Sequence, residues 1–95
     1  MRKYELVYII SPELDEEKMG AIIEKFNTVI TDNDGEVLKT DKWGRRKLAY
    51  EIKKKTEGVY VLVNYQGETI VTDELDRLLK INEGILKHMI IKIEE

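Results

Sequence analysis

The order in which two hydrophobic periodicities follow one another is the feature that most constrains how this chain can fold. Residues 3–10 alternate like a strand, and apolar residues at helical spacing then run from Met19 to Ile30. The whole chain repeats these two patterns in the order strand, helix, strand, strand, helix, strand. The later segments are strands at 36–53, 58–66 and 85–93, with a second helix at 69–81 before the last strand.

Local signals predict where the two helices begin and end. Acidic residues 15–17 suit the positive end of a helix dipole, so the first helix is expected to begin there. Residues 32–35 should end this helix, with Gly35 as the left-handed cap. For the second helix, Thr69 and Thr72 are the two candidate N-caps.

This order of elements predicts the fold class. With right-handed crossovers it gives a split βαβ arrangement, the ferredoxin-like α+β sandwich. We expect two helices on one face of a four-stranded antiparallel sheet, with the first and third strands central and the second and fourth at the edges. The other face is left to solvent or to a partner. A length of 95 residues fits a single domain, expected over 1–95.

Composition excludes several classes of function. The chain has no cysteine and one histidine, so disulfides, thiolate nucleophiles and the common Cys and His metal motifs are excluded. We therefore expect no metal and no cofactor. Its apolar runs are far shorter than the roughly 20 residues that span a bilayer, and a signal-peptide core is lacking. The sequence thus predicts a cytoplasmic protein.

One segment contradicts the acidic character of the chain. Residues 42–55, KWGRRKLAYEIKKK, contain seven basic side chains and one acid, Glu51, so their net charge is 7 − 1 = +6. Because the whole chain carries −3, the other residues sum to −9. An acidic protein is not expected to coat nucleic acid with its whole surface, but its composition is compatible with a local basic patch. The segment is therefore the first candidate for a functional surface.

The length of the second strand indicates that this basic segment is exposed at the surface and not packed in the core. Eighteen residues in a straight strand would reach about 60 Å, whereas a domain of this size is roughly 30 Å across. Either the strand breaks at Gly44 or its hairpin, with a loop at 54–58, projects from the body. Lysines on an edge strand also prevent aggregation. The pair Arg45-Arg46 beside Trp43 is more typical of phosphate contact and base stacking.

Residues 44–53, GRRKLAYEIK, resemble the signature of the bacterial small-subunit ribosomal protein six family. The start of the chain at 1–5, Pro12 with Leu14, and Gly58 are similar to that family as well. The resemblance implies a ferredoxin-like fold, no enzymatic activity and a structural role in the 30S subunit. It also implies contact with the central domain of 16S rRNA, made together with ribosomal protein eighteen of the small subunit.

Alternation along the segment divides the roles of its residues. Leu48, Tyr50 and Ile52 share one face and are expected in the core, whereas Trp43 could stack on a base, meet a partner or cover the end of the sheet. His88 is read as an ordinary strand residue. The predicted RNA-binding residues are Arg2, Lys3, Lys42, Arg45, Arg46, Lys47, Lys53, Lys87 and Lys92, and the predicted partner-binding residues are Val7, Ile9, Trp43, Tyr60 and Leu62.

Other functions of the same topology fit the sequence less well. An RNA-recognition motif stacks bases on aromatic side chains of the third strand, where residues 57–64 mostly present aliphatic ones. An acylphosphatase-like enzyme needs a phosphate-cradling loop, but residues 11–14 contain an acid and Pro12, which lacks an amide donor. A protein-interaction or small-molecule regulatory module stays open as the alternative, since a fold alone does not define function.

Overall fold

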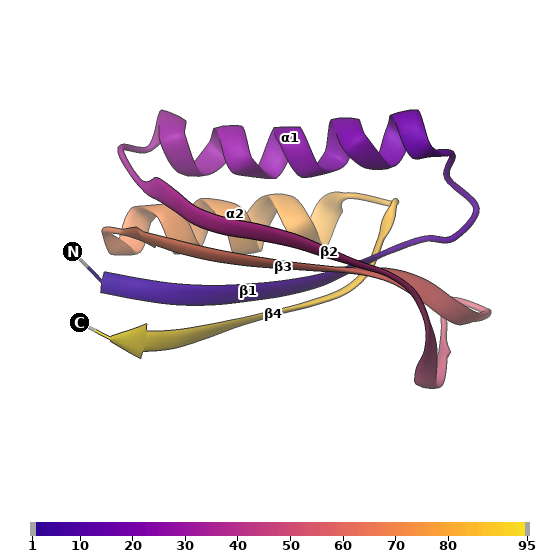
Figure 1. Ribbon diagram of the computed structural model, residues 1–95. Helices are drawn as coiled ribbons and strands as arrows, with labels where there is room; N and C mark the ends of the chain where they lie inside the picture. The colour runs from indigo at the N-terminus through magenta and orange to yellow at the C-terminus, as the bar shows by residue number, and fades with distance from the viewer. Residues whose placement is uncertain (1, 95) are drawn as a thin grey trace.

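The computed structural model describes residues 2–94 and has the predicted order of elements (Figure 1). Met1 and Glu95, the ends of the predicted domain, lie outside the described residues, as does the Met1 of the family-like start. The strands pair in one antiparallel sheet in the order β2-β3-β1-β4, so the first and third strands are central. The elements are β1 (Arg2–Ile10), α1 (Glu16–Asp32), β2 (Glu36–Ile52), β3 (Lys55–Gly67), α2 (Thr69–Ile81) and β4 (Ile85–Glu94).

Both helices cover one face of the sheet, and the core lies between these two layers (Figure 1). Alternate residues of β1, among them Leu6 and Tyr8, point into this layer and are fully buried. The ring of Tyr8 meets Phe26 of α1 edge-on, with ring centroids 5.6 Å apart, and Leu75 of α2 closes the layer. The ferredoxin-like fold and the predicted buried face of the first strand are therefore confirmed.

The first helix begins as predicted but ends differently. The carboxylate of Asp15 accepts a hydrogen bond of 2.8 Å from the backbone amide of Lys18, which caps the helix. At the other end, Asp34 has the left-handed φ of 64°, so the prediction for Gly35 was wrong. Gly35 is needed for space, because a Cβ there would lie 2.9 Å from the carbonyl oxygen of Ile30.

The start of the second helix also corrects the prediction. Glu68 occupies the N-cap position and makes no side-chain capping bond, so neither Thr69 nor Thr72 caps this helix. Thr72 instead pairs its hydroxyl with that of Tyr65 at 2.8 Å. This bond joins α2 to β3 and stabilises a tyrosine hydroxyl that is otherwise removed from water.

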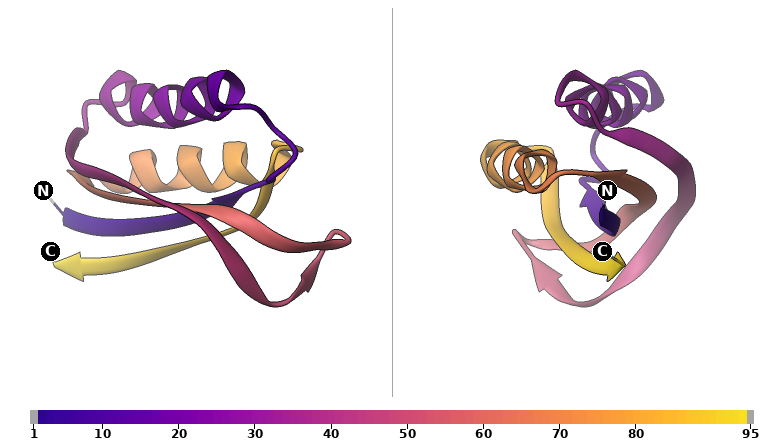
Figure 2. Two further views of the ribbon diagram at one scale, coloured as in Figure 1. Left: turned by 45° about the vertical axis from the view of Figure 1, so that its right-hand side comes forward. Right: turned by 90° about the vertical axis from the view of Figure 1, so that its left-hand side faces the viewer.

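The long second strand is both interrupted at Gly44 and part of a projecting hairpin, which are the two alternatives that its length predicted. A straight strand of this length would reach about 56 Å, but the molecule measures 37 × 25 × 22 Å. The strand pairing shifts register between Lys42 and Gly44, where Gly44 has φ 90°. Beyond this bulge the β2–β3 hairpin bends away from the helices and projects from the body (Figures 1 and 2). Its turn is formed by Lys53 and Lys54, not by residues 54–58.

The projecting hairpin corrects the predicted core positions of the basic segment. Tyr50 is 58% exposed, and Leu48 and Ile52 are only partly buried, because the hairpin extends past the layer that the helices cover. Gly58, predicted to end the loop, lies inside β3 and is buried. A side chain there would collide with Ile9 of β1, so this position also requires glycine for space.

Candidate nucleic-acid interface

Pairing between β2 and β3 places the two arginines of the basic segment on opposite faces of the hairpin. Arg45 lies opposite Val59, and its guanidinium donates to Glu57 at 3.1 Å and to the carbonyl oxygen of Pro12 at 3.4 Å. Arg46 follows on the other face, where its guanidinium lies 6.0 Å from the centre of the Trp43 ring. Both arginines are exposed, so both remain reachable from solvent.

Three ion pairs neutralise cations of the hairpin, and one of these cations, Lys55, lies beside the turn, opposite Ile52. The ammonium group of Lys42 lies 2.6 Å from the carboxylate of Glu16, at the start of α1. Lys55 pairs with Glu13 in the β1–α1 connection, and Arg45 pairs with Glu57 across the hairpin. By the neck we mean these three pairs together, two of them near the base of the hairpin and one beside its turn. Pairs as exposed as these contribute little to stability, but each neutralises one cation of the basic segment.

The far part of the hairpin is held against β4. Lys87 of β4 donates a hydrogen bond of 2.6 Å to the hydroxyl of Tyr50, and its ammonium group lies 5.0 Å from the ring centre. Lys53 donates to the carbonyl oxygen of Ile85 at 3.0 Å. These two contacts join the turn region of one edge hairpin to the other edge strand. Lys87 of β4 is therefore brought together with the basic segment.

The remaining predicted cations lie elsewhere. Arg2 begins β1 and donates to the hydroxyl of Thr69 at the start of α2. Lys3 pairs in register with residue 94, and Lys92 with Tyr4, at the same end of the sheet. This end lies opposite the projecting hairpin (Figure 1). The nine predicted RNA-binding residues therefore form two separate groups rather than one surface.

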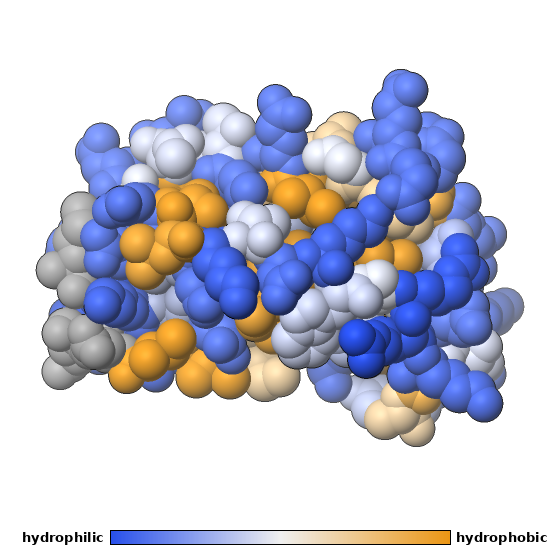
Figure 3. All heavy atoms as spheres, in the orientation of Figure 1, coloured by the Kyte–Doolittle hydropathy of each residue, from blue (hydrophilic) through white to orange (hydrophobic). Residues whose placement is uncertain are grey.

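The sheet face away from the helices presents an apolar surface. Val7 of β1 lies in register between Leu62 of β3 and Met89 of β4, so these three side chains form a row on this face. Trp43 is 43% exposed and stacks on Tyr60, with ring centroids 6.3 Å apart. Figure 3 shows hydrophobic side chains gathered along the lower left, at the level of β1 and β4, and hydrophilic ones over the hairpin.

The predicted partner-binding set requires one correction and one addition. Ile9 is only 6% exposed and packs at the position where β3 carries Gly58, so it offers almost no contact area. Met89, Ile91 and Ile93 of β4 are instead exposed at about half of their surface. The alternation of residues 85–93 could have shown this row. In a strand, residues 89, 91 and 93 point to the same side of the sheet as Lys87, which was predicted to be exposed for RNA contact.

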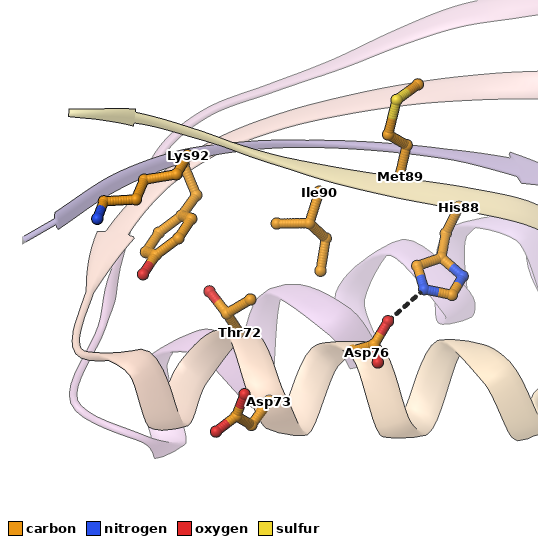
Figure 4. Close-up of a pocket in the computed structure, with 8 residues that line it drawn as sticks. Thr72, Asp73, Asp76, His88, Met89, Ile90 and Lys92 are labelled. Atoms are coloured by element: carbon orange, nitrogen blue, oxygen red, sulfur yellow. Dashed lines mark hydrogen bonds and ion pairs between the residues drawn. The ribbon is translucent and has the colours of Figure 1, made fainter. Parts of the chain in front are cut away.

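A pocket of about 370 Å³ lies between α2 and β4 (Figure 4). His88 points into it and bonds the carboxylate of Asp76 at 2.8 Å, whereas Met89 lies on the opposite side of β4. The hydrogen bond from His88, and then that from Lys80 one turn along the helix, lower the pKa of the Asp76 carboxyl. Among the described residues no group of three metal-binding side chains occurs, and this cluster ties α2 to the edge of the sheet.

The fold and these two surfaces define a small two-layer α+β domain with a basic surface on the hairpin and an apolar surface on the sheet. No helix among residues 2–94 is long and apolar enough to cross a membrane. A family model described as ribosomal protein S6 matches residues 3–92, and the chain therefore belongs to that family. The family consists of ribosomal proteins, so the chain is not an enzyme.

Individual relatives agree with this assignment. The small ribosomal subunit protein bS6 of Desulforamulus reducens is 53% identical over 97% of both chains. That of Alkaliphilus metalliredigens is 55% identical over the full length of both. The crystal structure of 30S ribosomal protein S6 from Thermotoga maritima is 29% identical and superimposes with a TM-score of 0.92 over 97% of this chain and 87% of that one.

Proposed function

We propose that this chain is a structural component of the bacterial 30S ribosomal subunit in the cytoplasm. In this role it binds the central domain of 16S rRNA together with ribosomal protein eighteen of the small subunit. Membership of the ribosomal protein S6 family supports the ribosomal role. Relatives more than half identical to this chain carry the name small ribosomal subunit protein bS6, which points the same way.

The proposal that the chain binds two partners rests on one observation. The basic and the apolar surfaces occupy different parts of the molecule. The projecting hairpin bears exposed cations, whereas the open sheet face bears Val7, Leu62 and Met89 in one row. Phosphates are attracted to the first surface, and a protein is suited to the second. Two partners of different chemistry can therefore be bound at the same time.

Electrostatics explains why the two partners should bind cooperatively. Residues 42–55 carry +6 and the rest of the chain −9, so RNA that approaches the hairpin also meets a repelling body. A basic protein docked on the sheet face would neutralise part of that body. Binding of the partner would thereby raise the affinity for RNA, and by linkage RNA would raise the affinity for the partner equally.

Filter binding to a fragment of the 16S rRNA central domain tests this proposal. The chain alone is expected to bind weakly, and an equimolar amount of small-subunit protein eighteen should lower the dissociation constant at least tenfold. A fragment from another domain of the same rRNA serves as the control. Equal affinity for both fragments, or no effect of the second protein, would contradict the proposal.

A further inference from the structure

The seven cations of the basic segment fall into two groups according to whether a carboxylate neutralises them. The neck pairs Lys42, Arg45 and Lys55 with three glutamates, so its net charge is 3 − 3 = 0. Residues 46–54, which we call the tip, contain the other four cations and one acid, so the tip carries 4 − 1 = +3. Within residues 2–94, no cation of the tip lies within ion-pair distance of a carboxylate.

The register between β2 and β3 explains why Glu57 does not neutralise Lys47. Glu57 lies directly opposite Lys47 on β3, but its carboxylate is engaged by Arg45 at 3.1 Å. Arg46 is directed over the ring of Trp43 instead of toward an acid. The exposed side chain of Lys54 extends from the turn. The uncompensated charge of this hairpin therefore lies between Arg46 and the turn, beyond the bend at Gly44.

The turn itself is built from residues that do not favour it. Ile52 and Lys55 pair across a two-residue turn, and both turn residues have positive φ, 48° at Lys53 and 66° at Lys54. Two positive φ values are typical of a type I′ turn, in which Asn-Gly is preferred and a longer side chain is strained. Strained residues of this kind persist mainly where they serve a function. Two lysines at this turn therefore indicate a use for their charge.

Two contacts fix the tip in place before any ligand arrives. Lys53 reaches back to the carbonyl oxygen of Ile85 at 3.0 Å, and Tyr50 accepts the hydrogen bond from Lys87. With its end anchored to β4, the hairpin does not have to be ordered when it binds. A preorganised cluster of cations loses less conformational entropy on binding than a flexible one.

We infer that the tip is the phosphate-binding element of the hairpin and that the neck is structural. Arg46, Lys47 and Lys54 contact the phosphates of the nucleic acid, and Lys53 is a positioning residue. This inference rests on the proposed function and deepens it. It assigns Lys54, which was absent from the predicted RNA-binding residues, and it removes Lys42 and Arg45 from direct phosphate contact.

Salt dependence of RNA binding separates the two groups of cations. The unmodified chain and its variants are titrated with the rRNA central-domain fragment, in the presence of small-subunit protein eighteen, from about 50 to 200 mM salt. The salt slope is the steepness with which the logarithm of the binding constant falls as the logarithm of the salt concentration rises. Lys47→Gln with Lys54→Gln should reduce this slope by about 0.7 to 0.9 for each cation removed, and should weaken the affinity by about fivefold for each cation at 0.1 M salt. Lys18→Gln, on the exposed side of α1, is the control for loss of one charge.

The neck is tested by a change that keeps the net charge. Lys42→Gln combined with Glu16→Gln removes one neck pair and should leave the salt slope unchanged. A slope that falls for this pair as much as for the tip variants would overturn the inference, as would a tip variant that behaves like the Lys18→Gln control. If the unmodified complex itself does not bind the fragment, the proposed function is wrong together with this inference. Binding with an unaltered slope in the tip variants contradicts the inference alone.

Substitutions at the turn separate loss of charge from loss of folding. Lys54→Gly suits the positive φ and should raise the urea midpoint while it lowers the salt slope. Lys54→Arg should keep the salt slope of the unmodified chain, because it keeps a cation at the same position. Weaker binding by Lys54→Gly with a lower urea midpoint would indicate a role in folding instead of phosphate contact, and would overturn the assignment of this residue.

Discussion

Lys87 on β4 donates a hydrogen bond of 2.6 Å to the hydroxyl of Tyr50 on β2, although these strands form the two opposite edges of the sheet. The contact exists because the β2–β3 hairpin bends at Gly44 and curls past the central strands (Figure 2). A residue predicted for the core and a cation predicted for RNA thus meet on the surface. The hairpin is a positioned arm, and its orientation depends on a few exposed contacts.

Changes at Tyr50 are expected to loosen this arm while the fold stays intact. Tyr50→Phe removes the hydrogen bond and keeps the ring near Lys87, whereas Tyr50→Ala removes both. Because Tyr50 is 58% exposed, neither variant should lower the free energy of unfolding by more than about 1 kcal/mol. Amide hydrogen exchange should become faster in the hairpin, more so for alanine than for phenylalanine. Unchanged exchange in both variants would show that the arm is held by other contacts.

Gly58 and Gly20 form a matched pair for the effect of one added methyl group. In β3, Gly58→Ala places a Cβ against Ile9 of the neighbouring strand and should lower the free energy of unfolding by about 1 to 3 kcal/mol. In α1, Gly20→Ala meets no atom within 4 Å and should raise it by about 0.5 to 1 kcal/mol. Urea denaturation measures both. Equal effects at the two positions would refute the close contact at Gly58.

The same alternation pattern predicted burial correctly in one strand and wrongly in another. In β1, Leu6 and Tyr8 are buried because the strand runs beneath both helices. In β2, Leu48 and Tyr50 alternate in the same way, but the hairpin extends past the helices and no layer covers it. Periodicity shows which residues share a face, whereas burial also depends on what lies above that face. The sequence contains no local signal for the edge of the helical layer.

The predicted roles of Gly35 and Gly58 in turns were wrong for a related reason. Gly35 and Gly58 are typical turn residues, but both are needed because another part of the chain approaches closely. The left-handed positions are held by Asp34, Lys53 and Lys54. Because residues other than glycine rarely adopt positive φ, residue preferences did not reveal these three positions. Strand order, helix positions and the displayed basic segment depend on longer patterns and were predictable, whereas the anchoring of the hairpin to β4 was not.

Two buried tyrosines are expected to respond oppositely to loss of their hydroxyl groups. Burial raises the pKa of Tyr8, and its hydroxyl has no hydrogen-bond partner among residues 2–94. Tyr8→Phe should therefore raise the free energy of unfolding by about 1 kcal/mol, since an unsatisfied buried group is removed. Burial raises the pKa of Tyr65 to about 12, but its hydroxyl pairs with Thr72 at 2.8 Å.

The control for this prediction is Tyr65→Phe, which leaves the Thr72 hydroxyl without its partner and should cost about 1 kcal/mol. Both variants keep the aromatic ring, including the stacking of Tyr65 on Tyr4 at 5.2 Å. Urea denaturation near neutral pH gives the two values. A loss of stability in Tyr8→Phe equal to that in Tyr65→Phe would mean that the Tyr8 hydroxyl is hydrogen-bonded in solution.

The carboxylate of Asp76 makes stability depend on pH at the junction of α2 and β4. Hydrogen bonds from His88 and Lys80 lower its pKa in the folded state below the value of about 3.9 for an unfolded aspartate. The charged form is thus favoured by folding, so its contribution is fully present above about pH 5 and is lost as the pH falls below about 4. Because the side chain is 43% exposed, this contribution is at most about 1 kcal/mol.

Asp76→Asn tests the sign of this dependence. Near pH 7 the variant should be less stable than the unmodified chain, and the difference should shrink as the pH falls from about 4 toward 2, where Asp76 becomes protonated and neutral like the asparagine. Asp73→Asn, one turn away on the same helix and exposed, accounts for the general effect of removing one negative charge. Urea denaturation over this pH range measures the free energies. A difference that grows toward acid would mean that the Asp76 carboxyl is stabilised in its protonated form, contrary to the geometry of the pocket.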